Sequence, residues 1–177
     1  MQERIVVENR LALELIGPQH TAAATALIDL SRTELTAWLP WAETTDEAAY
    51  REFVARIAAG RSDGSLAGSA YAILVDGAFA GCIAFHDEIP GERAAQIGYW
   101  LGTPYVGRGW MTKSVDALAT VGFAAFGLRR IEILADAENA RSRAVAARAG
   151  FALRTIRRGL FAGRERDEAV YERLAPS

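Results

Sequence analysis

The chain of 177 residues has one cysteine and no strong excess of either charge. A single cysteine, Cys82, forms neither an internal disulfide nor a cysteine-based metal site, and its apolar neighbours predict a buried thiol. The formal net charge of −2 provides no basic field for nucleic acid. No apolar run reaches the roughly 20 residues of a membrane span, and the N-terminus lacks a signal-peptide core. These absences predict a cytoplasmic protein that binds neither nucleic acid nor membrane.

The composition and the periodicity predict one folded domain over residues 1–177. Hydrophobic residues make up 51% of the chain and charged residues 24%, as in an ordinary globular protein. In chain order we expect a strand at 11–15, helices at 21–35 and 46–59, strands at 69–75 and 79–85, a strand ending at 101, a helix ending near 126, a strand at 130–135, a helix from 139 or 140 to 150, and strands at 152–158 and 168–174. Asp76-Gly77 predicts a hairpin turn. This order predicts a mixed α/β sheet with a crossover helix.

The segment 97–112 carries the strongest functional signal. A strand ends at Leu101, Gly107 and Gly109 then form a turn, and apolar residues follow at helical spacing. Exposed amides at the start of a helix attract anions, because the N–H groups lack partners and the helix dipole favours negative charge. The segment therefore predicts a phosphate or pyrophosphate site. It is not a P-loop, because no Gly-Lys-Ser/Thr follows. It is not a dinucleotide fingerprint, because the third glycine position is occupied by Thr112. An ordinary strand-to-helix connection is the alternative.

Several motifs along the chain resemble those of the GNAT N-acetyltransferase family. They are Ile-Gly-Tyr-Trp-Leu at 97–101, Gly-Arg-Gly-Trp-Met-Thr at 107–112, Glu-Asn-Ala-Arg-Ser at 138–142, Arg-Ala-Gly-Phe at 148–151 and Trp-Leu-Pro-Trp at 38–41. In detail they resemble the branch that acetylates the N-terminal amines of ribosomal proteins. The resemblance implies a mostly antiparallel, twisted sheet, flanked by about four helices and splayed where acetyl-CoA binds.

The resemblance also implies which residues hold acetyl-CoA, the acetyl donor. The pantetheine arm would pair with backbone near Leu101 and receive a hydrogen bond from Asn139, for which helix capping is an alternative role. Backbone amides would cradle the pyrophosphate, and the residues of this cradle are Val106, Gly107, Arg108, Gly109, Trp110, Met111 and Thr112. Val106 and Met111 differ from the residues that many relatives carry, but contacts made by the backbone tolerate such changes.

The implied reaction is direct attack of an amine on a thioester through a tetrahedral intermediate. Ser142 stands where the branch keeps a serine that protonates the departing thiolate; a helix-surface serine is the alternative. An N-terminal α-amine, with an ordinary pKa near 7.7–8.0 against about 10.4 for lysine, needs only a weak base.

The residue that acts as the base is not identified by the motifs. Gln96 stands where many relatives carry a glutamate, and Ala146 stands where others carry a tyrosine acid. Residues 154–164 contain no carboxylate. His86, Asp87 and Glu88 are substitutes at a strand end, where a solvated polar loop is the alternative.

Clues to the acceptor come from aromatic and basic residues. Trp38, Trp41 and Trp100 would line an acceptor groove, although core packing explains Trp100 equally well. The final hairpin carries a basic cluster that attracts an acidic partner or CoA phosphates, or is neutralised by neighbouring carboxylates; its members are Arg154, Arg157, Arg158, Arg164 and Arg166. No metal ligand set is evident.

Three functions remain open at this point. The first is acetylation of a protein N-terminal α-amine, and the second is acetylation of a small amine such as a polyamine, amino acid or antibiotic. The third is a catalytically weak module that binds acyl-CoA and regulates another process. The sequence also leaves a homodimer open.

Overall fold

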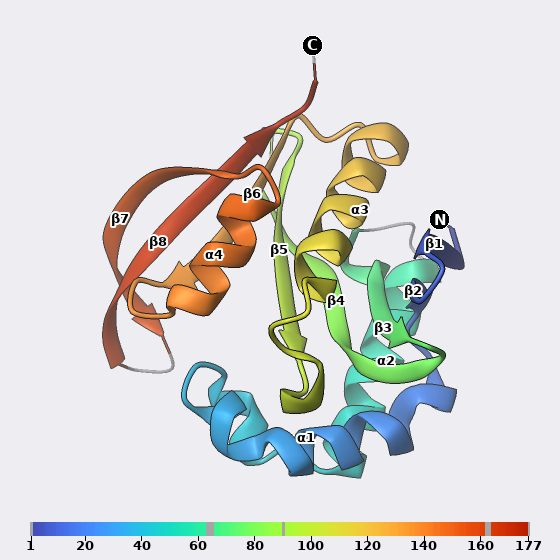
Figure 1. Cartoon of the computed structure of the whole chain (residues 1–177). Helices are drawn as coiled ribbons and strands as arrows, with labels where there is room; N and C mark the ends of the chain where they lie inside the picture. Colours follow the sequence, from blue (N-terminus) through green and yellow to red (C-terminus); the bar gives the residue numbers. More distant parts are fainter. Residues whose placement is uncertain (1, 63–65, 90, 162–163, 177) are drawn as a thin grey trace.

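A computed structural model describes residues 2–62, 66–89, 91–161 and 164–176 (Figure 1). Its strands form one eight-stranded sheet in the order β1-β2-β3-β4-β5-β6-β8-β7. Their bounds are β1 Arg4–Glu8, β2 Leu11–Leu15, β3 Ala70–Val75, β4 Ala78–Ile89, β5 Ala94–Leu101, β6 Arg130–Asp136, β7 Ala152–Phe161 and β8 Arg164–Leu174. Among the described strands only β5 and β6 pair in parallel; the other neighbours are antiparallel.

Four α-helices cover the two faces of this sheet (Figure 1). They are α1 Thr21–Thr36, α2 Glu47–Ser62, α3 Trp110–Ala125 and α4 Ala140–Arg148. Helices α3 and α4 pack over one apolar cluster on one face of the sheet, and α1 and α2 pack over a second cluster on the other face. The crossover helix between β5 and β6 is α3, as parallel pairing requires. The predicted mixed sheet with four helices is therefore confirmed.

Strand alternation decides which residues enter which half of the core. Phe85 and Ile97 lie in the cluster under α3 and α4, whereas Cys82 and Trp100 lie in the cluster under α1 and α2. Cys82 is a buried free thiol, as expected, and burial raises its pKa to about 12. The thiol therefore stays protonated and acts as a small apolar group.

Strand β1 and helix α2 differ from the predictions because tertiary contacts create the first and extend the second, and β7 and β8 also run farther than predicted. Strand β1 was not predicted, and it forms by pairing with β2, which leaves Val6 exposed on an edge strand. Helix α2 continues past Gly60 to Ser62, and Arg61 in its last turn donates a hydrogen bond to the carbonyl of Ile16. Strand β1 therefore depends on its hairpin partner, and the end of α2 on a contact between residues 45 positions apart.

Strand β4 also runs farther than expected, to Ile89, because it pairs with β5 through His86 opposite Gln96. The alternative of a solvated polar loop at 86–88 is therefore wrong for the backbone, which is a strand, although His86 and Glu88 are exposed. The hairpin turn is confirmed, with positive φ at Asp76 (51°) and Gly77 (80°). No helix within the described ranges is both long enough and apolar enough to cross a membrane.

Candidate active site

The sheet opens where β5 and β6 separate. These strands pair only at Ala94–Arg130, Ala95–Ile131 and Gln96–Glu132, although β5 continues to Leu101 and β6 to Asp136. Beyond this point β5 stays paired with β4 and β6 with β8. The facing edges of the two strands have no strand between them in the described chain. This opening is the splay that the resemblance implied, and an extended ligand could pair with the free edge of β5.

The glycine turn connects this opening to α3. Gly107 and Gly109 have φ of 77° and 80°, and a Cβ built at either would find no atom within 4 Å. Helix α3 begins at Trp110, whose buried side chain anchors the first turn, while residues 106–109 are exposed. Among the described residues, no carbonyl outside the helix accepts a hydrogen bond from the amides of residues 107–112. The turn therefore presents a row of available donors to open space, which suits an anion.

Asn139 caps helix α4 beside the end of β6. Its Oδ1 accepts a hydrogen bond from the Ser142 amide at 3.0 Å, and its carbonyl accepts one from the Arg143 amide at 3.1 Å. The capping role, which was the alternative to ligand binding, is thus present. Asp136 supports this corner, because its Oδ1 accepts from the Glu138 amide at 2.8 Å.

Ser142 lies in the first turn of α4, half-buried, with its hydroxyl facing β5. Its Oγ is 3.0 Å from the phenol oxygen of Tyr99, and the Ser142 carbonyl oxygen, 3.2 Å away, is a second acceptor within reach of the same phenol. Burial raises the pKa of Tyr99 to about 12, against a smaller lowering by the hydrogen bond to Ser142, so the phenol is neutral. The serine is therefore half-buried against β5 and hydrogen-bonded to Tyr99.

The three tryptophans do not gather as one group. Trp41, in the 3₁₀ turn Pro40–Glu43, meets Trp100 of β5 edge-on with ring centroids 6.0 Å apart, and Trp41 remains 41% exposed. Trp100 is 9% exposed and also packs on Phe79, so it is largely a core residue. Trp38 follows α1, is half-buried, and forms no ring pair with the other two in the described chain.

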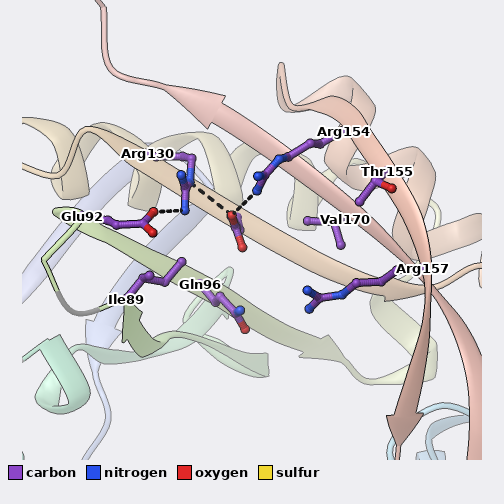
Figure 2. Close-up of a pocket in the computed structure, with 9 residues that line it drawn as sticks. Ile89, Glu92, Gln96, Arg130, Arg154, Thr155, Arg157 and Val170 are labelled. Carbon is purple, nitrogen blue, oxygen red and sulfur yellow. Dashed lines mark hydrogen bonds and ion pairs between the residues drawn. The ribbon is translucent and has the colours of Figure 1, made fainter.

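A cavity of about 530 Å³ lies on the opposite face of the sheet from α4, beside the last β5–β6 pair (Figure 2). Gln96 lines it from β5, and Figure 2 shows Arg130, Arg154 and Arg157 extending toward its interior. At its base is Glu132, with a side chain only 7% exposed, 3.1 Å from Arg130 Nε and 3.2 Å from an Arg154 guanidinium nitrogen.

Sequence reasoning did not single out Glu132. Its only sequence signal is a charged residue at an alternate position of the strand Arg130–Asp136. The cavity is lined by residues from β5, β6, β7 and β8. Helices α3 and α4 separate β5, β6 and β7 in the sequence, so no local pattern brings these residues together.

The basic cluster of the last hairpin is neutralised by carboxylates. Arg154 pairs with Glu132 and Glu172, and Arg166 pairs with Asp136 at 2.7 Å. Arg157 pairs with Glu168, and Arg158 with Glu165 and Asp167. The Arg164 side chain lies outside the described part. The described arginines therefore offer no free cationic patch.

Of the substitute base candidates, His86 has a described side chain beside β5. It stands opposite Gln96 in the β4–β5 pairing, and a Cβ built on Gly98 would come within 2.8 Å of His86 Nε2. The imidazole therefore lies over the β5 backbone just past the point where β5 and β6 part. The Glu88 carboxylate is directed elsewhere and accepts a hydrogen bond from the Leu66 amide at 3.1 Å. The Asp87 side chain is outside the described part.

This opening, with the glycine turn at the start of α3 and Ser142 on α4, defines a class of protein. A family model described as the acetyltransferase (GNAT) domain matches residues 10–152. The chain belongs to this family and is an acyltransferase, as its motifs predicted.

Individual relatives are similar over nearly their whole length. YdaF of Bacillus subtilis (strain 168), named a putative ribosomal N-acetyltransferase, is 31% identical over 170 residues, which cover 95% of this chain and 92% of YdaF. The ribosomal-protein-serine acetyltransferase of Escherichia coli (strain K12) is 28% identical over 155 residues, 86% of this chain and 85% of its own.

A solved structure shows the same architecture. RimL, described as a ribosomal L7/L12 alpha-N-protein acetyltransferase and determined in complex with coenzyme A, matches with a TM-score of 0.87. The two chains are 29% identical, and the match covers 98% of each. The predicted fold and family are thus confirmed by sequence and by structure.

Proposed function

We propose that this protein transfers the acetyl group of acetyl-CoA to the N-terminal α-amine of a protein, of the ribosomal type. The observation that carries the proposal is the opening between β5 and β6. It leads at one end to the available amides of the glycine turn and is bordered by Ser142 on α4. Two relatives named above support the choice of acceptor. One is named a putative ribosomal N-acetyltransferase and the other a ribosomal-protein-serine acetyltransferase, and each matches this chain over most of its length.

The residues present fit acetyl-CoA. The cradle at 106–112 offers several amides and no side chain in front of Gly107 and Gly109, so a pyrophosphate can approach the backbone closely. Backbone near Leu101 would pair with the pantetheine arm as an added strand does, and the Asn139 side-chain NH₂ would donate to that arm while its Oδ1 caps α4. When bound, acetyl-CoA supplies the thioester carbonyl that the acceptor amine attacks.

Ser142 would act as the acid at the departing sulfur. Its hydroxyl lies on the α3–α4 side of the opening, whereas Gln96 and the cavity lie on the other face of the sheet. An acceptor would therefore enter from the cavity side and the sulfur would leave on the Ser142 side. Trp41 and Trp100, on the cavity side, would support the acceptor chain, with Trp38 at the margin.

The function is tested by incubating the protein with acetyl-CoA and panels of N-terminal peptides and small amines, while free thiol is measured. Turnover on peptides with serine or another free α-amine, but not on small amines, supports the proposal. The reverse pattern indicates a small-amine acetyltransferase. No turnover together with clear thermal stabilisation by CoA indicates the binding module, since a ligand at 100 times its Kd adds about 2.7 kcal/mol.

Substitution of the serine tests the acid role. Ser142→Ala should lower the single-turnover rate about a hundredfold, the scale of a lost donor to developing charge. The Kd for CoA, measured by calorimetry, should stay the same because CoA is bound through the backbone cradle. An unchanged rate would remove Ser142 from the mechanism.

A further inference from the structure

One side-chain contact joins β5 to α4 across the opening. Tyr99 of β5 and Ser142 of α4 are 3.0 Å apart at their hydroxyl oxygens, and the phenol also reaches the Ser142 carbonyl at 3.2 Å. Tyr99 stands three residues beyond Gln96, the last β5 residue paired with β6. The contact therefore lies in the splayed part, where ligand and serine would meet.

The direction of this hydrogen bond matters for the serine. The phenol has one proton, which it can donate to the Ser142 carbonyl or to the Ser142 hydroxyl. In the first arrangement the serine proton points to the Tyr99 oxygen and is occupied. In the second arrangement Ser142 accepts from Tyr99, and its own proton is free to point into the opening. A hydroxyl that accepts one hydrogen bond also becomes a stronger donor, because the two bonds polarise each other.

We propose that Tyr99 is a positioning residue for acetyl transfer, which holds the Ser142 hydroxyl toward the departing sulfur and strengthens it as a donor. This inference rests on the proposed function. In the step that it serves, the C–N bond forms, the C–S bond breaks, and the electron pair goes to sulfur. Ser142 gives its proton to that sulfur, the amine loses one to solvent, and solvent returns one to Ser142. Tyr99 stabilises the charge that develops on the Ser142 oxygen.

The pKa of the Tyr99 phenol is consistent with its role as a hydrogen-bond donor that keeps its proton. Burial raises the pKa of Tyr99 to about 12, so the phenol keeps its proton at neutral pH and is available as a hydrogen-bond donor to Ser142. Its hydroxyl acts only through the serine.

The chain offers a matched control for removal of this hydroxyl. Tyr171 of β8 is a buried tyrosine that also contacts α4, where its hydroxyl accepts a hydrogen bond from Arg143 Nε at 3.2 Å. Tyr171→Phe removes one contact to the residue beside Ser142 and leaves Ser142 untouched. It should change stability about as much as Tyr99→Phe without changing the rate.

The experiment measures single-turnover rates at saturating acetyl-CoA and acceptor peptide for the wild type, Tyr99→Phe, Ser142→Ala, the double variant and Tyr171→Phe. We expect Tyr99→Phe to slow the step about tenfold, because the transition state loses one charge-assisted hydrogen bond. The Kd for CoA should stay unchanged. The double variant should be no slower than Ser142→Ala, because Tyr99 acts only through that serine. Circular dichroism and the CoA-induced rise in Tm show that each variant is folded.

The outcomes separate this inference from the function on which it rests. A wild-type rate for Tyr99→Phe, an equal loss in Tyr171→Phe, or multiplied losses in the double variant would each overturn the role of Tyr99 while acetyl transfer stands. A wild type without turnover on any acceptor would overturn both. A tenfold loss that disappears in the Ser142→Ala background would support the role.

Discussion

Gly107 and Gly109 show how single residues prepare the proposed donor site. Both hold a left-handed backbone that only glycine adopts without strain, and both face open space. Gly77 in the β3–β4 turn shares these features, with φ of 80° and no atom near a built Cβ, but it lies away from the opening. Comparing substitutions at Gly109 and Gly77 therefore separates the loss of stability caused by a Cβ in a left-handed residue from the loss of CoA affinity.

Gly109→Ala and Gly77→Ala should each lower the free energy of unfolding by about 1–2 kcal/mol, the cost of a left-handed residue with a Cβ. Only Gly109→Ala should weaken CoA binding, by about tenfold, because its methyl group occupies the space in front of the amides. Urea denaturation and calorimetry measure the two effects. Equal CoA affinity in both variants would place the pyrophosphate elsewhere.

Glu132 is a second residue whose substitution has a definite expected result. Its carboxylate is nearly enclosed and lies between Arg130 and Arg154, so Glu132→Ala removes the buried partner of both guanidiniums and leaves them only the more exposed Glu92 and Glu172. We expect a loss of about 1–3 kcal/mol in the free energy of unfolding. The control is Glu165→Ala, which breaks an exposed pair with Arg158 and should cost less than about 1 kcal/mol. Similar losses in the two variants would show that Glu132 is not structurally important.

At the scale of elements, the start of α4 combines two roles in Asn139. The structure shows its Oδ1 capping the helix, and we propose that its NH₂ holds the pantetheine arm. Asparagine and aspartate cap helices equally well, but aspartate has no NH₂ to donate. The two possible substitutions therefore test the two roles separately.

Asn139→Asp should keep the stability of the wild type, and Asn139→Ala should lose about 1 kcal/mol. Both should weaken the binding of acetyl-CoA, because both lack the donor. Thermal unfolding measures the stability of each variant, and calorimetric titration of the same samples measures the Kd for acetyl-CoA. Full affinity in Asn139→Asp would leave Asn139 with its capping role alone.

Elements formed by local signals were predicted well, and those formed by pairing were not. The Asp76-Gly77 turn, the Asn139 cap and the helix after Gly109 follow from backbone preferences of a few residues. Strand β1 and the extension of β4 to Ile89 exist because β2 and β5 supply hydrogen-bond partners. In each case the partner is the other strand of a hairpin, so the residues of one strand taken alone do not reveal the element.

At the scale of the whole molecule, one sheet separates two environments. The face under α3 and α4 holds Ser142 and Tyr99, and the other holds the cavity beside Gln96 and the Trp41–Trp100 pair. The opening between β5 and β6, beyond Gln96 and Glu132, connects these two faces of the sheet. A donor and an acceptor can therefore approach the same point from opposite sides without competing for space.

Because all described strands belong to one sheet, we expect thermal unfolding in one cooperative transition. CoA at 100 times its Kd should add about 2.7 kcal/mol, which for a chain of this size raises Tm by about 5–11 °C. Scanning calorimetry with and without CoA measures both. The rise should shrink in Gly109→Ala at the same CoA concentration, and two separate transitions would contradict a single domain.

The sequence alone determined the class of this protein, because its motifs depend on local chemistry: glycines that hold a left-handed turn, a capping asparagine, and a serine three residues later. It also showed that position 96 carries no carboxylate. Only the tertiary structure decided that Tyr99 touches Ser142, that His86 lies over Gly98, and that Glu132 is buried between two arginines. These contacts join residues from different strands and helices, and the pairing that places them is a property of the assembled sheet.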